Sequence, residues 1–476
     1  MDSPTRLSAR AMAAAIREKK LSPVELVEAH LQRIEQLNPR LNAFVTLRGE
    51  KAREEARAAE ATVARGQPLG PLHGVPVSIK SCIDVAGLPC EAGSKLRAGY
   101  VAAADAPLVA RLRAAGAIIL GNTNVPDMLM AYETDNLLYG KTRSPWDLER
   151  TPGGSSGGEA AAIAACCSAG GVGSDGGGSI RVPAHFSGIC GLKPTPGRIP
   201  GTGHFPPNTG PFAFLGVVGP LARTVADLEL LLEVMAGPDK GDTSSAPVPF
   251  SRASDDVCKR YNIGFFEDDA RTPVTPETRA AVRAAAEALQ RAGFQVSPFR
   301  PSVLEPARQA WWKLFVLGGA MVLGPLVAGR EAELHPVLRA VMAIAAAEPP
   351  LTAETLMSAW MARDELRLQL LTEMERFPVL LCPACAVPAF KHGERRWQVD
   401  GQSVAYLDAM SYTQWFNLLG NPGAVVPVGR SPEGLPIGVQ IVGRPFEEEI
   451  VLRVAAWVER ECGGWQEPPL SRSLTT

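Results

Sequence analysis

The sequence predicts an α/β protein in which one sheet runs through most of the chain and is flanked by helices. Stretches typical of strands alternate with helical stretches in the first third of the 476 residues, and strands return towards the C-terminus. Between them, residues 302–376 have helical patterns only and are rich in aromatic side chains. We therefore interpret 302–376 as a helical insertion into one large domain.

Periodicity and capping place the individual elements. Ser22–Glu25 is a capping box with proline at the first helical position, and apolar residues at helical spacing extend this helix to Asn38. Further helices are predicted at 50–65, 105–115, 224–235, 275–292 and 447–461. Strands are predicted at 41–47, 75–79, 117–120, 261–266, 379–382, 424–428 and 437–442. Residues 128–140 have no clear period and are predicted to form a loop.

Composition excludes several classes of protein. The chain has 48 basic and 50 acidic residues and no basic patch, so we expect no nucleic-acid partner. The first 20 residues lack the apolar core of a signal peptide. The longest apolar stretch, Leu314–Ala328, is too short and too interrupted by glycine and proline to predict a membrane span. Nine cysteines suggest reduced core thiols, so we expect a cytoplasmic protein, with a homo-oligomer left open.

The stretch Thr151–Pro196 is the most informative part of the sequence. Two Gly/Ser clusters, 153–158 and 170–179, flank a run at 159–168 that is apolar on every side. We predict a buried helix for this run and a glycine-rich turn at each of its ends. Serines lie in these turns, and glycine lets main-chain N–H groups approach a ligand closely. This arrangement is typical of a catalytic centre rather than of a linker.

Two short motifs in this stretch suggest other functions. Gly153–Gly157 matches GxSxG, which would make Ser155 the nucleophile of an α/β-hydrolase esterase. That alternative needs an acidic residue and then a histidine downstream of Ser155. The later histidines do not stand in a sequence context typical of such a catalytic histidine. Gly171–Gly176 matches the dinucleotide fingerprint GxGxxG, but the residues that follow are not expected to open a helix, which argues against a nucleotide.

Lys80 is the candidate base, because the chain has only six histidines and none stands in a sequence context that marks it as the partner of these serines. It stands at the end of the predicted strand 75–79. A lysine can accept a proton when burial lowers its pKa, since desolvation disfavours the ammonium form.

These elements resemble the amidase signature family of serine hydrolases. The resemblance rests on GVPVSIK at 74–80, PGGSSGGE at 152–159 and GSDGGGSIRVPAHFSGICGLKPTPG at 173–197, which occur in the family's order and spacing. Glu159 is more typical of the branch that resembles fatty acid amide hydrolases. The segment 302–376 lies outside the resemblance.

The resemblance implies a fold and a mechanism. The fold is one α/β domain over 1–476, with a large twisted mixed sheet covered by helices on both faces and a signature core at about 70–230. The reaction is hydrolysis of carboxylic amide C–N bonds, extending to esters, anilides or carbamates. Its partners are a small amide and water, with no metal and no cofactor. The implied roles are Ser179 as the nucleophile that forms an acyl-enzyme, Ser155, after a cis peptide, as the bridging serine, and Lys80 as the base.

The same resemblance assigns supporting residues. Backbone N–H groups of Gly176, Gly177, Gly178 and Ser179 would hold the oxyanion, Ser156 would bond Lys80, and Asp175 and Arg181 would brace the turn.

Substrate choice depends on the apolar residues near these motifs. We expect a pocket for fairly apolar acyl or aryl groups, with the insertion 302–376 as its wall, lined by Met128, Met130, Tyr132, Trp311 and Phe315. The alternative is a protein like the ammonia-releasing component of a glutamine-dependent amidotransferase, which needs partner subunits.

Overall fold

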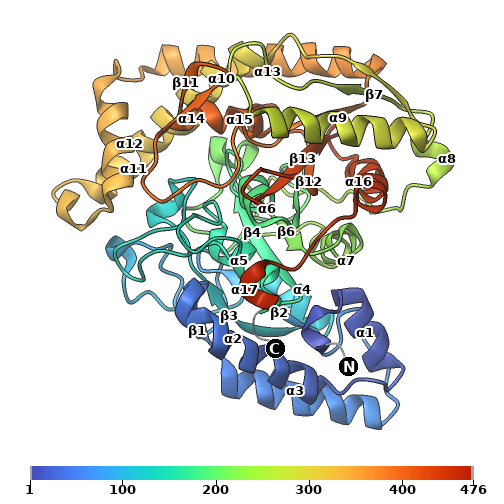
Figure 1. Cartoon of the computed structure of the whole chain (residues 1–476). Helices are drawn as coiled ribbons and strands as arrows, with labels where there is room; N and C mark the ends of the chain where they lie inside the picture. The colour runs from blue at the N-terminus through green and yellow to red at the C-terminus, as the bar shows by residue number, and fades with distance from the viewer. Residues whose placement is uncertain (1–2, 473–476) are drawn as a thin grey trace.

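The computed structural model describes residues 3–472, and eleven of its strands form one mixed sheet (Figure 1). These strands are β1 Phe44–Leu47, β2 Pro76–Lys80, β3 Ile118–Thr123, β4 Gly170–Asp175, β5 Cys190–Lys193, β6 Val217–Ala222, β7 Asn262–Phe265, β8 Gln295–Pro298, β9 Val379–Pro383, β12 Gly423–Arg430 and β13 Pro436–Val442. Their order is β1-β3-β2-β4-β6-β5-β12-β13-β9-β7-β8. Neighbours are parallel within β3-β2-β4 and β9-β7-β8 and antiparallel elsewhere, so the predicted mixed sheet is confirmed.

Helices account for most of the remaining regular structure. They are α1 Ala9–Arg17, α2 Pro23–Leu41, α3 Gly49–Ala64, α4 Pro107–Ala114, α5 Gly157–Ala164, α6 Arg181–Ser187, α7 Val225–Met235, α8 Asp255–Cys258, α9 Pro276–Arg291, α10 Leu304–Trp311, α11 Gly318–Val327, α12 Pro336–Ala347, α13 Ala353–Arg376, α14 Tyr406–Ala409, α15 Ser411–Leu418, α16 Glu448–Cys462 and α17 Pro469–Arg472. A two-stranded hairpin, β10 Arg396–Val399 and β11 Gln402–Ala405, stands apart from the large sheet.

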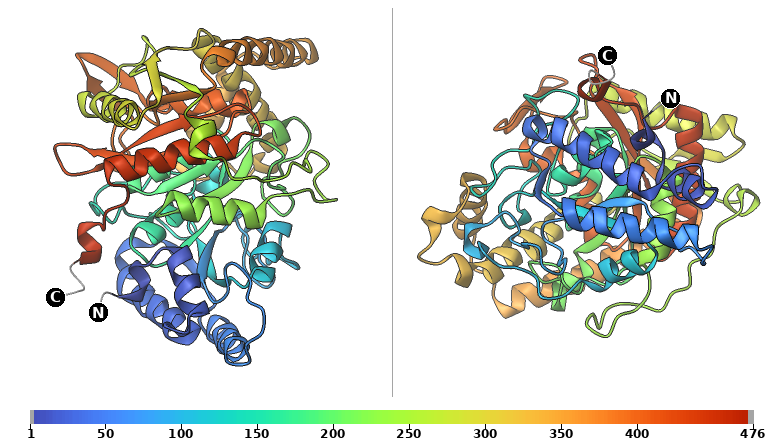
Figure 2. Two further views of the ribbon diagram at one scale, coloured as in Figure 1. Left: turned by 90° about the vertical axis from the view of Figure 1, so that its right-hand side faces the viewer. Right: turned by 90° about the horizontal axis from the view of Figure 1, so that it is seen from below.

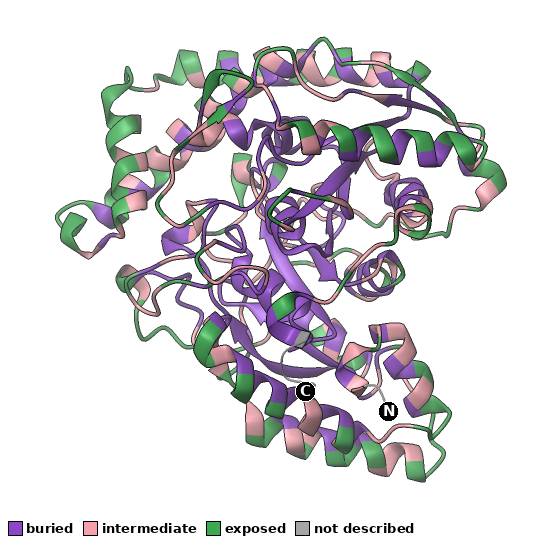
Figure 3. Ribbon diagram, in the orientation of Figure 1, coloured by how far each residue is buried: buried purple, intermediate pink, exposed green. Residues whose placement is uncertain are grey.

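Both faces of the sheet are covered by helices, as strand β12 illustrates. Side chains alternate between the faces of a strand. Ala424 and Val426 pack into the cluster that includes α7, α9 and α16, whereas Val425 packs with α5 and α6 on the other side. Burial follows this arrangement, with buried strands at the centre and exposed residues on the outer helices (Figure 3).

The segment 302–376 contains helices only and lies at the opposite end of the molecule from α1–α3 (Figures 1 and 2). Its first part is one continuous helical run, in which a π-helical turn, Trp312–Leu317, joins α10 to α11. The run Leu304–Val327 is therefore longer than the apolar stretch read from the sequence. Within the described residues it is the one helix long and apolar enough to cross a membrane, a test that buried core helices also pass, and 44% of its most apolar window is buried.

Two sequence predictions about the second glycine-rich cluster and the residues after it are wrong. Residues 170–175 form strand β4 rather than a turn, and a helix, α6, does open after the glycines. The glycines of β4 are there because neighbours pack against its backbone. A Cβ on Gly171 would lie 1.9 Å from Glu159 Oε1 and 2.3 Å from the Ser78 carbonyl oxygen. The predicted buried helix between the two clusters is confirmed as α5, every residue of which is buried.

Candidate active site

Lys80 lies at the C-terminal end of β2, the third strand from one edge of the sheet, and is fully buried. Its Nζ lies 2.7 Å from Ser155 Oγ, 2.9 Å from Ser174 Oγ and 3.4 Å from the Ser174 carbonyl oxygen. Burial lowers the pKa of Lys80 to about 8, although the nearby acidic groups Asp175 and Glu159 act in the opposite direction. The amine is thus half neutral in mildly alkaline solution.

Ser155 comes from the loop before α5 and is 2% exposed. The Gly154–Ser155 peptide bond is cis, as the resemblance implies. The backbone there has little room, because a Cβ on Gly154 would lie 2.7 Å from the carbonyl oxygens of Ala131 and Glu133. Close packing therefore keeps the Ser155 hydroxyl within hydrogen-bonding distance of Lys80.

Ser174, which the sequence analysis did not single out, takes the contact expected of Ser156. The Ser156 hydroxyl donates to the Ser174 carbonyl oxygen at 3.3 Å and accepts from the Ser174 N–H at 3.3 Å, and it makes no hydrogen bond to Lys80. The correction has a simple cause. Strand β4 runs parallel to β2, so Ser174 lies beside the end of β2 where Lys80 stands.

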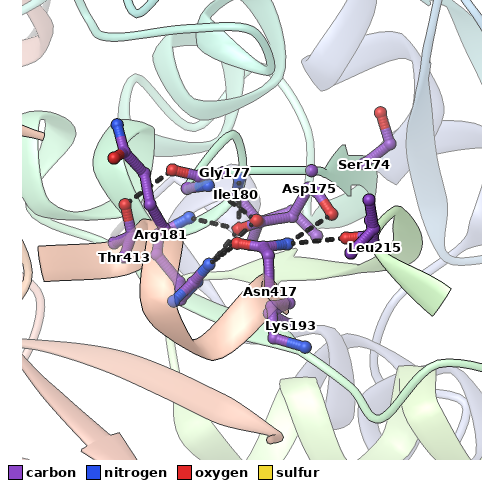
Figure 4. Close-up of polar contacts among 12 residues, drawn as sticks. Ser174, Asp175, Gly177, Ile180, Arg181, Lys193, Leu215, Thr413 and Asn417 are labelled. Carbon is purple, nitrogen blue, oxygen red and sulfur yellow. Dashed lines mark hydrogen bonds and ion pairs between the residues drawn. The ribbon is translucent and has the colours of Figure 1, made fainter. Parts of the chain in front are cut away.

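Asp175 and Arg181 brace the turn that carries Ser179 (Figure 4). Both side chains are fully buried, and Arg181 holds the two Asp175 oxygens at 2.9 and 3.0 Å. Asp175 also accepts from the backbone N–H groups of Gly178 at 2.7 Å and Ile180 at 3.1 Å. The Arg181 guanidinium keeps the pKa of Asp175 far below its ordinary value despite burial, so the carboxylate stays charged.

These contacts correct the expected set of oxyanion donors. The Gly178 N–H is directed at Asp175 Oδ1, so it is not available to a ligand. Within residues 3–472, the N–H groups of Gly176, Gly177 and Ser179 donate to no protein acceptor. Gly176 and Ser179 are also partly exposed at the surface of a cavity. Three donors of the expected four are therefore free.

Two cavities meet at Ser179. The smaller, about 130 Å³, is lined by Ser155, Ser174 and Gly176 on its polar side and by Met128, Phe212 and Leu323 on its apolar side. The larger, about 580 Å³, is lined by Tyr132, Trp311, Val341 and Ile344, with Arg395 and Arg396 among its polar residues. Met130 and Phe315 line both cavities. All five residues predicted for the pocket thus line one cavity or both.

The histidine expected by the GxSxG alternative is not at Ser155. His204 lines the smaller cavity, but its Nδ1 donates to the Pro206 carbonyl oxygen at 2.7 Å, and Ser155 makes its side-chain contact with Lys80. His185 is buried against backbone groups of Gly438 and Val387. The residues that the structure describes therefore lack the Ser–His pair of an esterase elbow.

The mixed sheet and the buried lysine–serine contact beside Ser179 define an α/β protein whose candidate active site is a lysine–serine centre. The chain belongs to the amidase family, whose model matches residues 25–452. It is 37% identical over 457 residues to an indoleacetamide hydrolase of Bradyrhizobium diazoefficiens, covering 95% of this chain and 86% of that protein. It is 34% identical over 501 residues to one subunit of the glutamyl-tRNA(Gln) amidotransferase of Anaeromyxobacter sp. strain K, covering 98% of both.

Solved structures agree with this assignment. A bacterial aryl acylamidase of the amidase signature family superposes with a TM-score of 0.85 at 28% identity, covering 96% of both chains. The predicted family, the predicted fold class and the prediction of an enzyme that acts on amides are thereby confirmed.

Proposed function

We propose that this chain is a self-sufficient hydrolase of N-substituted, fairly apolar amides, with Ser179 as nucleophile, Ser155 as proton relay and Lys80 as base. The observation that carries the proposal is the buried 2.7 Å contact between Lys80 and Ser155 beside Ser179, which lies where the two apolar cavities meet.

The three oxygens around Lys80 can accept from the three N–H donors of an ammonium, and they also accommodate a neutral amine, which has two N–H donors and one lone pair. In the neutral form, the two oxygens of Ser174 accept the N–H donors, which leaves the lone pair for the Ser155 hydroxyl. Ser155 can then take the Ser179 proton as it gives its own to Lys80.

The reaction proceeds through an acyl-enzyme. Ser179 Oγ attacks the amide carbon, and the N–H groups of Gly176, Gly177 and Ser179 stabilise the oxyanion. Ser155 returns a proton from Lys80 to the leaving nitrogen, and the C–N bond breaks. Water then attacks the ester by the same proton path in reverse, releasing the carboxylic acid and free Ser179.

Ser155 also suggests how the substrate lies. It lines the smaller cavity and not the larger one. Because Ser155 protonates the leaving nitrogen in this mechanism, the amine side of the substrate occupies the smaller cavity and the acyl side the larger. Both cavities have mainly apolar linings, which favours substituents of low polarity on both sides of the bond.

A second candidate function is that of the ammonia-releasing component of an amidotransferase, which the relative from Anaeromyxobacter favours. Glutamine is short and polar, and it would leave most of the 580 Å³ cavity unfilled. The apolar lining therefore favours hydrolysis by the chain alone.

All nine cysteines are free, which supports the proposal of a cytoplasmic enzyme.

The test is turnover by the purified chain alone. We expect hydrolysis of a hydrophobic acyl anilide with a kcat/KM at least about 100-fold above that for glutamine or for a primary amide of the same acid. Ammonia release from glutamine that exceeds anilide hydrolysis would instead favour the amidotransferase function.

A further inference from the structure

Three consecutive carbonyl oxygens, those of the last residue of β4 and of the two glycines after it, are each held by side chains from distant parts of the chain. Figure 4 shows two of these contacts, from Asn417 to Asp175 and from Thr413 to Gly177. The donors are Asn417 at 2.9 Å for the Asp175 carbonyl, Trp311 at 3.0 Å for that of Gly176, and Thr413 at 2.7 Å with Tyr132 at 2.8 Å for that of Gly177. Trp311 Nε1 is the one donor to the Gly176 oxygen within residues 3–472. This peptide unit therefore depends on a residue of the segment 302–376.

The hydrogen bond from Trp311 also fixes an N–H group. In a trans peptide unit the C=O and N–H bonds lie in one plane and point in opposite directions. A side chain that holds the Gly176 oxygen thus sets the direction of the Gly177 N–H. That N–H has no protein acceptor among the described residues, whereas the next one, of Gly178, is engaged by Asp175.

Packing keeps the indole in place over the two glycines. A Cβ on Gly177 would lie 2.5 Å from Trp311 Cζ2, and one on Gly176 would lie 2.5 Å from the ring of Phe315. Trp311 is 3% exposed and stacks on Phe315, with ring centroids 5.1 Å apart and an interplanar angle of 13°. The aromatic pair occupies the space that side chains at 176 and 177 would need.

We propose that Trp311 is a positioning residue, whose indole N–H holds the Gly176 carbonyl and thereby aims the Gly177 N–H at the oxyanion of the reaction. The inference rests on the proposed function, since it presupposes attack by Ser179. It gives the segment 302–376 a second task besides forming a cavity wall: it orients a backbone donor toward the reacting atoms.

The test is Trp311→Phe, which removes the N–H and keeps an aromatic ring over Gly177. Loss of one oxyanion donor lowers kcat by about 100- to 1,000-fold in other enzymes. A donor that is present but poorly aimed should cost about 10- to 100-fold in kcat, with KM for the anilide changed less than about threefold.

A second readout separates positioning from general damage. A trifluoromethyl ketone analogue of the substrate forms a tetrahedral adduct with a serine and carries an oxyanion. Its affinity should fall in Trp311→Phe by about the same factor as kcat/KM. The affinity for a non-reactive ketone isostere of the substrate, which tests the cavity alone, should stay within about threefold.

Trp312→Phe is the matched control. Trp312 is the next residue of the same helical run, is half-buried, and lines neither of the cavities at Ser179. It should keep the wild-type kcat and the wild-type affinity for the analogue. Tyr132→Phe should cost less than Trp311→Phe, because Thr413 still holds the Gly177 oxygen.

Two results would overturn the inference. One is a wild-type kcat in Trp311→Phe, and the other is a loss confined to KM and shared by both ketones. Should Trp311→Phe not fold, 3-benzothienylalanine at position 311, which has sulfur in place of the N–H at nearly the same shape, must give the same fall in kcat. If wild type and Trp312→Phe hydrolyse the anilide while Trp311→Phe does so equally well, the proposed function stands and this inference fails.

Discussion

Replacing Lys80 by methionine should abolish activity. It should also remove a contribution of the buried lysine that lowers the free energy of unfolding of the wild type. The side chain is fully buried, and its pKa falls from 10.5 in the unfolded chain to about 8 in the folded one. A shift of this size corresponds to about 3 kcal/mol in favour of the unfolded state below pH 8, where the lysine is protonated in both states. Methionine carries no charge and escapes this penalty.

The sign of the pH dependence follows from proton binding. Between the folded and unfolded pKa values the unfolded chain binds more protons, so the Lys80 contribution raises the free energy of unfolding as pH rises. From pH 8 to pH 10 this amounts to about 2 kcal/mol. Glu159, whose pKa burial raises to about 7, stays ionised over this range and adds little to the difference.

Urea unfolding of wild type and Lys80→Met at pH 8, 9 and 10, followed by tryptophan fluorescence, measures this effect. Loss of the contacts to Ser155 and Ser174 adds a constant offset, because neither hydroxyl titrates. The stability of the wild type relative to the variant should therefore grow by about 2 kcal/mol from pH 8 to pH 10. A difference that does not change with pH would refute the low pKa of Lys80.

Three further predictions concern the same site. The kcat/KM should rise through an apparent pKa near 8, because only the neutral Lys80 amine accepts a proton; a pH profile that is flat from 6 to 10 would contradict this role. Ser174→Ala should lower kcat about tenfold by removing a 2.9 Å contact to Lys80, whereas a wild-type kcat in steady-state assays would show that this contact is dispensable. Gly171→Ala should lower the free energy of unfolding by about 3 kcal/mol, because the added methyl group would overlap Glu159. Gly170→Ala should lower it clearly less in the same urea assay, because the nearest neighbour of its methyl group, at 3.1 Å, is a flexible leucine methyl.

Local patterns were enough to predict much of the fold. The apolar run inside Thr151–Pro196 predicted a buried helix, and α5 is one. Strand β4 is not predictable in this way, because its composition, GGVGSD, is that of a turn. Its glycines reflect the close approach of Glu159 and Ser78, a tertiary contact that propensity does not encode. Had β4 been recognised, its parallel pairing with β2 would have brought Ser174 to Lys80.

The finer parts of the site depend on side-chain directions that a sequence does not reveal. Whether Gly178 can bind an oxyanion depends on where the Asp175 carboxylate points, and it points at that N–H. The residues that hold the turn in place, Thr413 and Asn417, come from α15, more than two hundred positions away along the chain. No local pattern links them to Ser179, so their contacts with this turn are visible only in the folded structure.

Measuring the intact mass of the protein after treatment with a fluorophosphonate shows whether Ser179 is the activated nucleophile. We expect a single adduct on the wild type, none on Ser179→Ala, and slow labelling of Ser155→Ala, where the relay to Lys80 is lost. Labelling that persists in Ser179→Ala and disappears in Ser155→Ala would show instead that Ser155 is the nucleophile.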